Sequence, residues 1–274
     1  MKIFRQRGEL VIEAMRGKVA LERGDIQQLV GQKNIALIAQ YSQSRQQSRS
    51  LSQYLRELKK GGFFPVVIST CSEGPLEFPH GIPDEIIILQ RPNVGYDFGS
   101  WATALGVLPG VREADTVLLT NDSLLGPFSS IQHLLEWIKK PGADICAMTS
   151  SFQFVRHLQS FFLAFRGGIL ADQPWRDFFD GIRQQGDKYD VVTKYELGVS
   201  RTAFANAYST EEWVSSSELG VPYGNPTVDA WKKLIESDVP FLKRTIMTHP
   251  STEEEAVEAA MYIQRKYRTD IKEW

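Results

Sequence analysis

Short apolar runs alternate with stretches whose apolar residues recur at helical spacing, and this alternation limits the possible folds more than any other feature. The runs at 34–41, 63–70 and 85–90 have the continuous apolar character of strands covered on both faces. Between the first two runs, Leu51 and Leu55 begin a helical repeat. Strands that alternate with helices predict an α/β fold with a mostly parallel central sheet and helices on both faces.

The alternation continues beyond residue 90. Three more apolar runs predict strands, at 115–121, 143–150 and 160–165. Amphipathic stretches predict further helices, which lie around Trp101 and over 131–138, 175–182 and 192–199.

Start signals precede two C-terminal helices. Asn225 and Pro226 have the pattern of an N-cap and a first helical residue, and Ser251 to Glu254 has the pattern of a capping box. The polar segments 184–190 and 209–227 are expected to be loops that cover a site.

The chain has 274 residues, of which 42% are hydrophobic, and can bury a large core without disulfides. No linker divides it, so residues 34–274 are expected to form a single domain with C-terminal helices, preceded by an N-terminal helical extension over residues 1–33. Its 31 Lys and Arg nearly balance its 33 Asp and Glu, which argues against a nucleic-acid partner.

Cys71 and Cys146 have neither disulfide nor metal-ligand spacing, which favours a reducing, cytoplasmic location. No segment resembles a signal peptide or approaches the ~18 apolar residues that span a bilayer. Basic residues near the N-terminus allow peripheral contact with the anionic inner membrane, although a solvated helix face explains them better. These residues are Lys2, Arg5, Arg7, Arg16 and Lys18.

Three polar clusters directly follow predicted strands. They are Gln40-Tyr41-Ser42, Asn93 to Asp97, and Asn121-Asp122-Ser123. Ligands of open α/β sheets bind outside the carboxyl ends of the strands, so the clusters are candidates for one binding site. Ordinary turn chemistry is the alternative for each cluster taken alone.

Asp97 has two interpretations. Gly99 follows it at the start of a predicted helix, so Asp97 is a candidate helix N-cap. Alternatively, its carboxylate accepts hydrogen bonds from a nucleotide, and the neighbouring glycines let a ligand approach the backbone. Asp122 with its polar neighbours has the groups to hold a ribose hydroxyl or one corner of a divalent cation.

Several common catalytic motifs are absent from the sequence. The segment "AQYSQSRQQSRS", which follows the first predicted strand, contains no Gly and therefore no dinucleotide-binding turn. A P-loop, a Gly-x-Ser-x-Gly elbow and a His-Glu-x-x-His helix are also missing.

Five strings together resemble a known family. "RPNVGYDFGSWATAL", "LLTNDSLLGPF", "RHLQSFFLAF", "VVTKYELGVS" and "VPFLKR" occur in the order and approximate spacing of the rhamnan-synthesis F family of bacterial polysaccharide glycosyltransferases. The resemblance covers roughly residues 34 to 247. It implies a GT-A-like nucleotide-sugar transferase fold and the transfer of a sugar, L-rhamnose from a dTDP donor, to a saccharide or lipid-linked saccharide of a wall polysaccharide or O-antigen. Other polysaccharide-assembly enzymes are implied partners.

The three polar clusters supply the candidate donor contacts, and the resemblance implies a nucleotide-sugar as the ligand. The candidate contacts are Gln40, Tyr41, Asn93, Gly95, Asp97, Asn121 and Asp122. In GT-A enzymes an Asp-x-Asp binds the ribose and a metal, and here the position reads Asn121-Asp122-Ser123. Asp122 and His249 are the remaining candidate ligands for Mg²⁺ or Mn²⁺; the lost carboxylates weigh against a metal, and a surface His is the alternative for His249.

The string "KYELGVS" resembles the element that carries the general base in inverting GT-A enzymes, which makes Glu196 the candidate catalytic base. An exposed helix carboxylate beside Lys194 is the alternative. His157 is the second candidate base, and His157, Gln159 and Ser160 are candidates for the acceptor side unless they form a simple strand-entry turn. Three arginines are candidate diphosphate partners, namely Arg91, Arg156 and Arg166.

The sequence thus predicts a glycosyltransferase, with two alternatives. One is a catalytically inactive module that binds a nucleotide or glycan, suggested by the altered Asn121-Asp122-Ser123. The other is a structural subunit of a polysaccharide-assembly complex, docked through the basic N-terminus.

Overall fold

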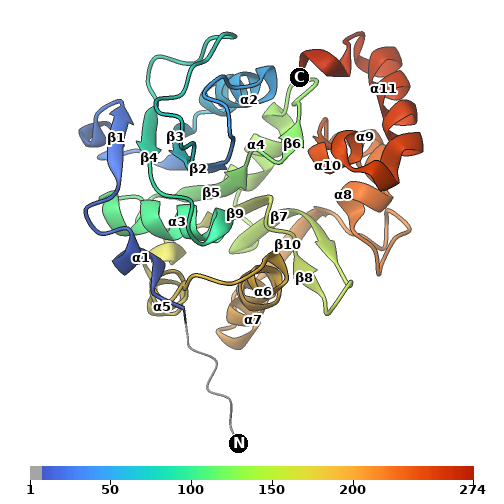
Figure 1. Ribbon diagram of the computed structural model, residues 1–274. Helices are drawn as coiled ribbons and strands as arrows, with labels where there is room; N and C mark the ends of the chain where they lie inside the picture. The colour runs from blue at the N-terminus through green and yellow to red at the C-terminus, as the bar shows by residue number, and fades with distance from the viewer. Residues whose placement is uncertain (1–7) are drawn as a thin grey trace, which may run out of the picture.

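The computed structural model describes residues 8–274, and nine strands of this part form a central sheet (Figure 1). The strand order is β1-β4-β3-β2-β5-β9-β7-β10, with β8 paired to β7 beside this path. The strands are β1 (Ala20–Arg23), β2 (Asn34–Gln40), β3 (Phe64–Ser69), β4 (Ile87–Gln90), β5 (Thr116–Asn121), β7 (Ile145–Ser151), β8 (His157–Leu158), β9 (Phe162–Arg166) and β10 (Thr210–Val214).

Six of the nine strands point the same way, although the neighbouring pairs divide evenly into four parallel and four antiparallel ones. Strand β2 is parallel to β3 and β5, β3 is parallel to β4, and β10 is parallel to β7. Strand β9 runs antiparallel between β5 and β7, and β1 is antiparallel to β4 at the edge. The predicted mostly parallel sheet is therefore confirmed.

Helices cover both faces of the sheet, as predicted. Strand β2 shows why, because Ile35 and Leu37 pack on one face while Ala36 and Ile38 pack on the other. The first face is covered by α1 (Val11–Ala14), α3 (Tyr96–Val107), α5 (Gln173–Asp180) and α7 (Leu197–Ala205), and the second by α2 (Arg49–Lys60) and α4 (Gln132–Lys139). Short helix α6 (Lys188–Val191) and a π-helical turn (Val192–Glu196) lead into α7.

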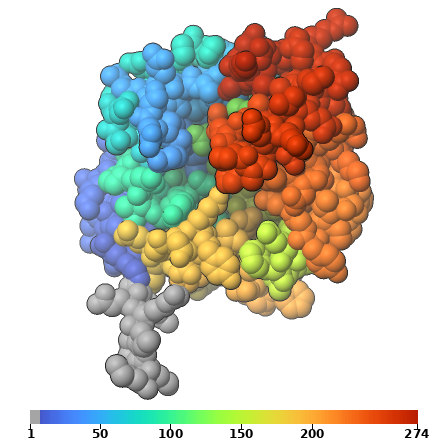
Figure 2. All heavy atoms as spheres, turned by 45° about the vertical axis from the view of Figure 1, so that its right-hand side comes forward, coloured from blue at the N-terminus to red at the C-terminus, as the bar shows by residue number. Residues whose placement is uncertain are grey.

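The C-terminal residues form a layer of their own, orange and red in Figure 2. We call residues 226–274 the C-terminal layer. It joins the sheet through a two-stranded ladder of β6 (Leu124–Leu125) and β11 (Leu242–Lys243), and a separate apolar cluster around Trp231, Ile235 and Ile263 holds it together. Its helices are α8 (Pro226–Asp229), α9 (Trp231–Glu236), α10 (Arg244–Thr248) and α11 (Glu253–Tyr267).

The edge strands β1 and β10 were not predicted, because their sequences are charged. Strand β10 lies within the segment 209–227, which the sequence predicted as a loop. Pairing with β7 supplies its backbone partners, and Glu212 is held by Ser150 Oγ at 2.9 Å and by Arg156. An edge strand needs no continuous apolar run, since one side meets solvent.

The expected N-terminal helical extension differs from the structure where the structure describes it. Between residues 8 and 33, only α1 and a short 3₁₀ turn are helical, and β1 pairs with β4 as an edge of the sheet. The basic residues Lys2, Arg5 and Arg7 lie outside the described residues. Within residues 8–274, none of the helices has the length and apolar character needed to cross a membrane.

The two predicted start signals have different outcomes. Asn225 is the N-cap of α8, and its side chain accepts a hydrogen bond from the Thr227 amide, as predicted. The predicted capping box from Ser251 to Glu254 is wrong: α11 begins at Glu253, and its N-cap Thr252 makes no side-chain cap. His249 instead accepts from the Ser251 amide and caps the 3₁₀ turn that comes first.

Candidate active site

A cavity of about 600 Å³ lies at the carboxyl ends of β2, β4 and β5. We call it the site cavity. The three polar clusters that follow these strands meet there, although they are far apart in the sequence. Its lining includes the predicted donor residues Gln40, Tyr41, Asn93, Gly95, Asp97 and Asp122.

Asp97 is bonded to the turn after β5. Asn121 Nδ2 donates to Asp97 Oδ2 at 2.8 Å, and Asn121 Oδ1 accepts from Ser123 Oγ at 2.6 Å. The N-cap of α3 is Gly95, without a side-chain cap, so the interpretation of Asp97 as an N-cap is wrong. Burial raises the pKa of Asp97, whereas the bond from Asn121 and the charge of Lys243 lower it.

Arg91 anchors the loop that precedes α3. Its guanidinium is buried and donates to Val94 O at 2.7 Å, Tyr96 O at 3.0 Å and Ser100 Oγ at 2.9 Å. These bonds hold Tyr96 at a φ of 55°, a rare conformation for a residue with a side chain. Arg91 is thus committed to the loop, and the prediction that it binds the diphosphate is not supported.

Two glycines at the start of α3 are required by packing. Gly95 has a φ of 81°, and a Cβ there would lie 2.8 Å from Val11 Cγ2. A Cβ on Gly99 would lie 2.3 Å from Val94 O. Both positions therefore need glycine whether or not a ligand approaches.

The other two arginines also have protein partners. Arg166 pairs with Glu211 and lines a different cavity with Asn34 and Thr116, at the opposite ends of β2 and β5, so its predicted diphosphate role is wrong. Arg156 forms an exposed ion pair with Glu212.

Glu196 is half-buried at the end of the π-helical turn. Its Oε1 accepts a hydrogen bond from the Ser160 amide at 3.2 Å. Burial raises its pKa, and the charges of His157 and Lys243 oppose that rise. The alternative of an exposed carboxylate beside Lys194 is wrong, because Lys194 turns away to Asp190 at 2.9 Å.

Two of the three predicted acceptor-side residues, His157 and Gln159, are buried. His157 is 4% exposed and its Nδ1 is hydrogen-bonded to Val155 O at 2.8 Å. Gln159 is 7% exposed and donates to Asn225 Oδ1 at 3.0 Å. These two side chains leave little surface for an acceptor to touch, whereas Ser160 is half-buried and its amide donates to Glu196.

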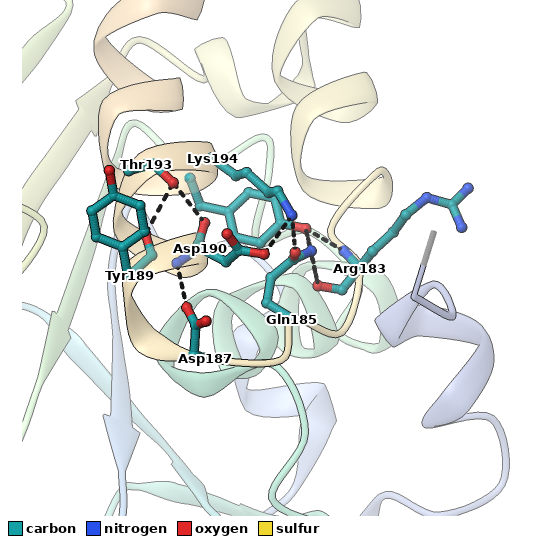
Figure 3. A network of polar contacts seen from close by, with 8 residues as sticks. Arg183, Gln185, Asp187, Tyr189, Asp190, Thr193 and Lys194 are labelled. Atoms are coloured by element: carbon teal, nitrogen blue, oxygen red, sulfur yellow. Dashed lines mark hydrogen bonds and ion pairs between the residues drawn. The ribbon is translucent and has the colours of Figure 1, made fainter. Parts of the chain in front are cut away.

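A polar network stiffens the segment that leads to Glu196 (Figure 3). Asp187 caps α6 by accepting from the Asp190 amide at 2.8 Å, and Lys194 binds both Asp190 and Gln185. Gln185 and the adjacent Lys188 also line the site cavity. The segment 183–196 therefore reaches from the cavity to the candidate base.

Lys243 was missed from the sequence. Its Nζ donates to Ser123 Oγ at 2.8 Å, and the charges of Asp97, Glu196 and Asp122 raise its pKa against the larger lowering by burial. It lies 120 residues from Ser123 in the sequence. The string "VPFLKR", in which a lysine follows two apolar residues, was the only signal for it.

The donor set does not fit a dedicated metal site. Residues 8–274 contain no group of three His, Cys, Asp or Glu side chains placed to hold an ion. His249 is exposed, and its Nδ1 is bonded to Ser251 Oγ at 2.7 Å. Asp122 Oδ2 accepts from the Tyr41 amide at 3.2 Å. The divalent cation stays a prediction that these side chains do not favour.

Replacing Asp122 by Asn is expected to stabilise the protein increasingly as pH rises. Burial and the charge of Asp97 raise the pKa of Asp122 from 3.8 to about 7. The wild type therefore binds an extra proton when folded and loses stability between about pH 4 and pH 7. At pH 8 we expect Asp122→Asn to gain on the order of 2 kcal/mol, and at pH 4 almost nothing. Urea unfolding at both pH values measures the difference in the free energy of unfolding between variant and wild type. Asp84→Asn, at an exposed position, is the control. A difference that does not change with pH would contradict the prediction.

The sequence of the chain matches the model of a described protein family. A family model described as rhamnan synthesis protein F matches residues 77–272. The match thus begins later than the sequence motifs suggested, and it includes the C-terminal helices.

Two curated relatives show weaker similarity. Virulence protein VirA of Vibrio anguillarum is 25% identical over 193 residues, which cover 59% of this chain and 62% of VirA. The uncharacterized protein y4gN of Sinorhizobium fredii is 25% identical over 122 residues, which cover 42% of this chain and 31% of that protein. The chain therefore spans less than two thirds of the length of these relatives.

Among solved structures, the glycosyltransferase GlyE of Streptococcus pneumoniae TIGR4 aligns with 89% of this chain and 63% of its own chain, at a TM-score of 0.42 and 14% identity. The family model, in contrast, covers well over half of the chain. The chain therefore belongs to the rhamnan synthesis protein F family, as its motifs predicted.

Proposed function

We propose that this protein is a GT-A-like glycosyltransferase that moves a sugar from a nucleotide-sugar donor to a growing saccharide in polysaccharide synthesis. The family description, which names rhamnan, supports L-rhamnose carried by dTDP as the proposed donor. The proposed acceptor is a saccharide or lipid-linked saccharide of a cell-surface polysaccharide. A cytoplasmic location with contact to the membrane face stays a prediction.

One observation carries the proposal. The ammonium of Lys243 interacts electrostatically with Asp97, Asp122 and Glu196, which come from three separate segments. The proposed donor carboxylates Asp97 and Asp122 line a cavity of about 600 Å³, and Lys243, which is bonded to Ser123 of the same lining, links them electrostatically to the proposed base. A purely structural fold has no need to gather buried carboxylates with perturbed pKa values around a cleft, whereas catalytic sites often do.

The site cavity continues into a second hollow of about 490 Å³, and the two share Tyr41, Thr70 and Asn93. Tyr41 is 55% exposed at this junction, where its ring is free to stack on a base. We place the nucleoside across the junction and the diphosphate and sugar toward Asp122. Lys18 and Gln43 line the far end of the second hollow, where they are suited to contact a base.

The proposed reaction uses Glu196 as a general base. Its carboxylate takes the proton of an acceptor hydroxyl as that oxygen attacks the anomeric carbon. The bond from the anomeric carbon to the phosphate oxygen breaks, and the nucleoside diphosphate leaves with the electron pair. A raised pKa suits this role, because the basicity of a carboxylate rises with its pKa.

Nucleotide binding is the first test. We expect dTDP, and not thymidine alone, to raise the melting temperature, with a stabilisation of about 2.7 kcal/mol at a concentration 100 times the dissociation constant. A thermal-shift series with dTDP, UDP and GDP, each with EDTA and with Mn²⁺, measures it. A structural subunit predicts that no nucleotide has an effect, and that result would overturn the proposal.

A binding module without activity is the second alternative, and the internally bonded Asn121 and Ser123 favour it. Such a module would bind the nucleotide but would neither transfer sugar nor hydrolyse the donor. Slow hydrolysis of the nucleotide-sugar in the absence of acceptor, followed by release of the nucleoside diphosphate, separates the two.

A further inference from the structure

The proposed reaction creates a charge problem at the site cavity. A departing nucleoside diphosphate carries several negative charges, and the cavity wall already holds Asp97 and Asp122. The negative charges of the diphosphate and of these carboxylates repel each other strongly where water is partly excluded. A positive group must therefore stand close to the diphosphate, and the described carboxylates do not gather into a metal site.

We propose that Lys243, assisted by Arg244, binds the diphosphate of the donor in the place of a divalent cation. This inference rests on the proposed function. Its basis is the position of two cationic side chains that the C-terminal layer brings to the turn after β5.

Strand pairing fixes that position. In the β6–β11 ladder Lys243 lies opposite Leu124 and Leu242 lies opposite Leu125. The Arg244 amide donates to Ser123 O at 3.0 Å, which continues the pairing by one residue. Because side chains alternate along a strand, a slip of one residue would turn Lys243 away from Ser123. The register thus holds the ammonium on Ser123, the residue that follows Asp122.

The ammonium of Lys243 has donors to spare. An ammonium carries three N–H groups, and the one side-chain bond seen here goes to Ser123 Oγ at 2.8 Å. Among residues 8–274, no carboxylate lies within the 4.0 Å of an ion pair with Lys243. Burial lowers the pKa of Lys243, and its attraction at longer range to Asp97, Glu196 and Asp122 opposes that lowering without committing the ammonium to one of them.

Two further cations stand nearby. Arg244 Nη2 lies 3.5 Å from Asp122 O, and its charge lowers the pKa of Asp122. Lys188 lines the site cavity from the segment 183–196 and interacts with Lys243 as a like charge. Lys243 does not line the cavity itself but is bonded to Ser123, which does, and an anion bound near both ammonium groups would offset their mutual repulsion. This arrangement suits the two phosphates of the donor.

The test compares ligands that differ only in phosphate. Calorimetry measures the affinity of the wild type, Lys243→Gln and Lys243→Arg for a nucleoside diphosphate, the monophosphate and the nucleoside, in EDTA and in Mn²⁺. The nucleoside diphosphate is whichever of dTDP, UDP and GDP stabilises the wild type most. Lys232→Gln, which removes an exposed ammonium of the same layer, is the matched control.

We expect wild-type affinity for the diphosphate to be the same in EDTA and in Mn²⁺. Lys243→Gln should lose at least about tenfold for the diphosphate and little for the nucleoside, whereas Lys243→Arg should retain most of the affinity. Wild-type binding that disappears in EDTA, or an unchanged diphosphate affinity in Lys243→Gln, would overturn the inference. The EDTA comparison needs no variant, so it can still overturn the inference if Lys243→Gln fails to fold. If no nucleotide binds the wild type at all, the proposed function itself fails.

Discussion

Replacement of Glu196 by Gln is expected to lower the transfer rate by about 10²- to 10⁴-fold while nucleotide affinity stays unchanged. Gln keeps the shape of the side chain and can still accept from the Ser160 amide, so the fold around the π-helical turn should persist. It cannot take a proton from the acceptor. Steady-state transfer assays, with nucleotide affinity measured in parallel, check both parts of this prediction.

The pH dependence of the wild-type transfer rate also tests whether Glu196 is the base. The base must be deprotonated, and burial raises the pKa of Glu196. The rate should therefore rise with pH through a range above that of an ordinary glutamate. Exposed Glu255→Gln is the control and should leave both the rate and its pH profile as in the wild type.

If Glu196→Gln were as active as the wild type, Glu196 would not be the base. The assignment of the donor site would not be affected. Direct transfer to an acceptor attacking from the far side should also invert the anomeric configuration. NMR of the product shows that configuration, and retention would exclude the single-step mechanism.

Replacement of Trp101 by Ala is expected to destabilise the protein by about 3–5 kcal/mol. Trp101 is fully buried in α3, its ring meets that of Phe98 with centroids 5.0 Å apart, and its Nε1 donates to Thr120 O at 3.1 Å. The change leaves a cavity and removes a buried hydrogen bond. A loss of this size is a large fraction of the ~5–15 kcal/mol that domains usually possess.

Urea unfolding measures the effect, and Trp137→Ala is the matched control because Trp137 is only half-buried. A loss no larger than that of Trp137→Ala would contradict the prediction. Trp101 also fixes the end of β5 next to Asn121, so a destabilised variant should lose nucleotide affinity before it unfolds completely.

The interior strands were predictable because burial on both faces leaves a continuous apolar run. The segment 34–41 became β2 almost residue for residue. The direction of β9 was not predictable, since an apolar run has the same character whether it runs parallel or antiparallel. Strands β1 and β10 were missed because edge strands draw much of their stability from backbone pairing.

The candidate site shows a similar division. Residues that directly follow strands, such as Tyr41 and Asp97, were predicted to be near each other and do line one cavity. Gln40 also lines it, although its side chain is tied to Ser69 Oγ at 2.7 Å and to Gln47. Lys243 was not predictable, because its place depends on a two-residue ladder between segments that nothing in the sequence links.

The β6–β11 ladder also sets the order in which the site is completed during synthesis. A ribosome that has released residues 34–225 has made the sheet and its carboxylates but not the ammonium of Lys243. Until the C-terminal layer docks, the nascent chain therefore carries Asp97, Asp122 and Lys188 in the cavity lining, but not Lys243 beside it. A diphosphate held by Lys243 against the turn after β5 would clamp that late-made layer to the sheet, because a ligand that binds only the docked form stabilises it by mass action. Nucleotide depletion would then loosen the C-terminal layer first.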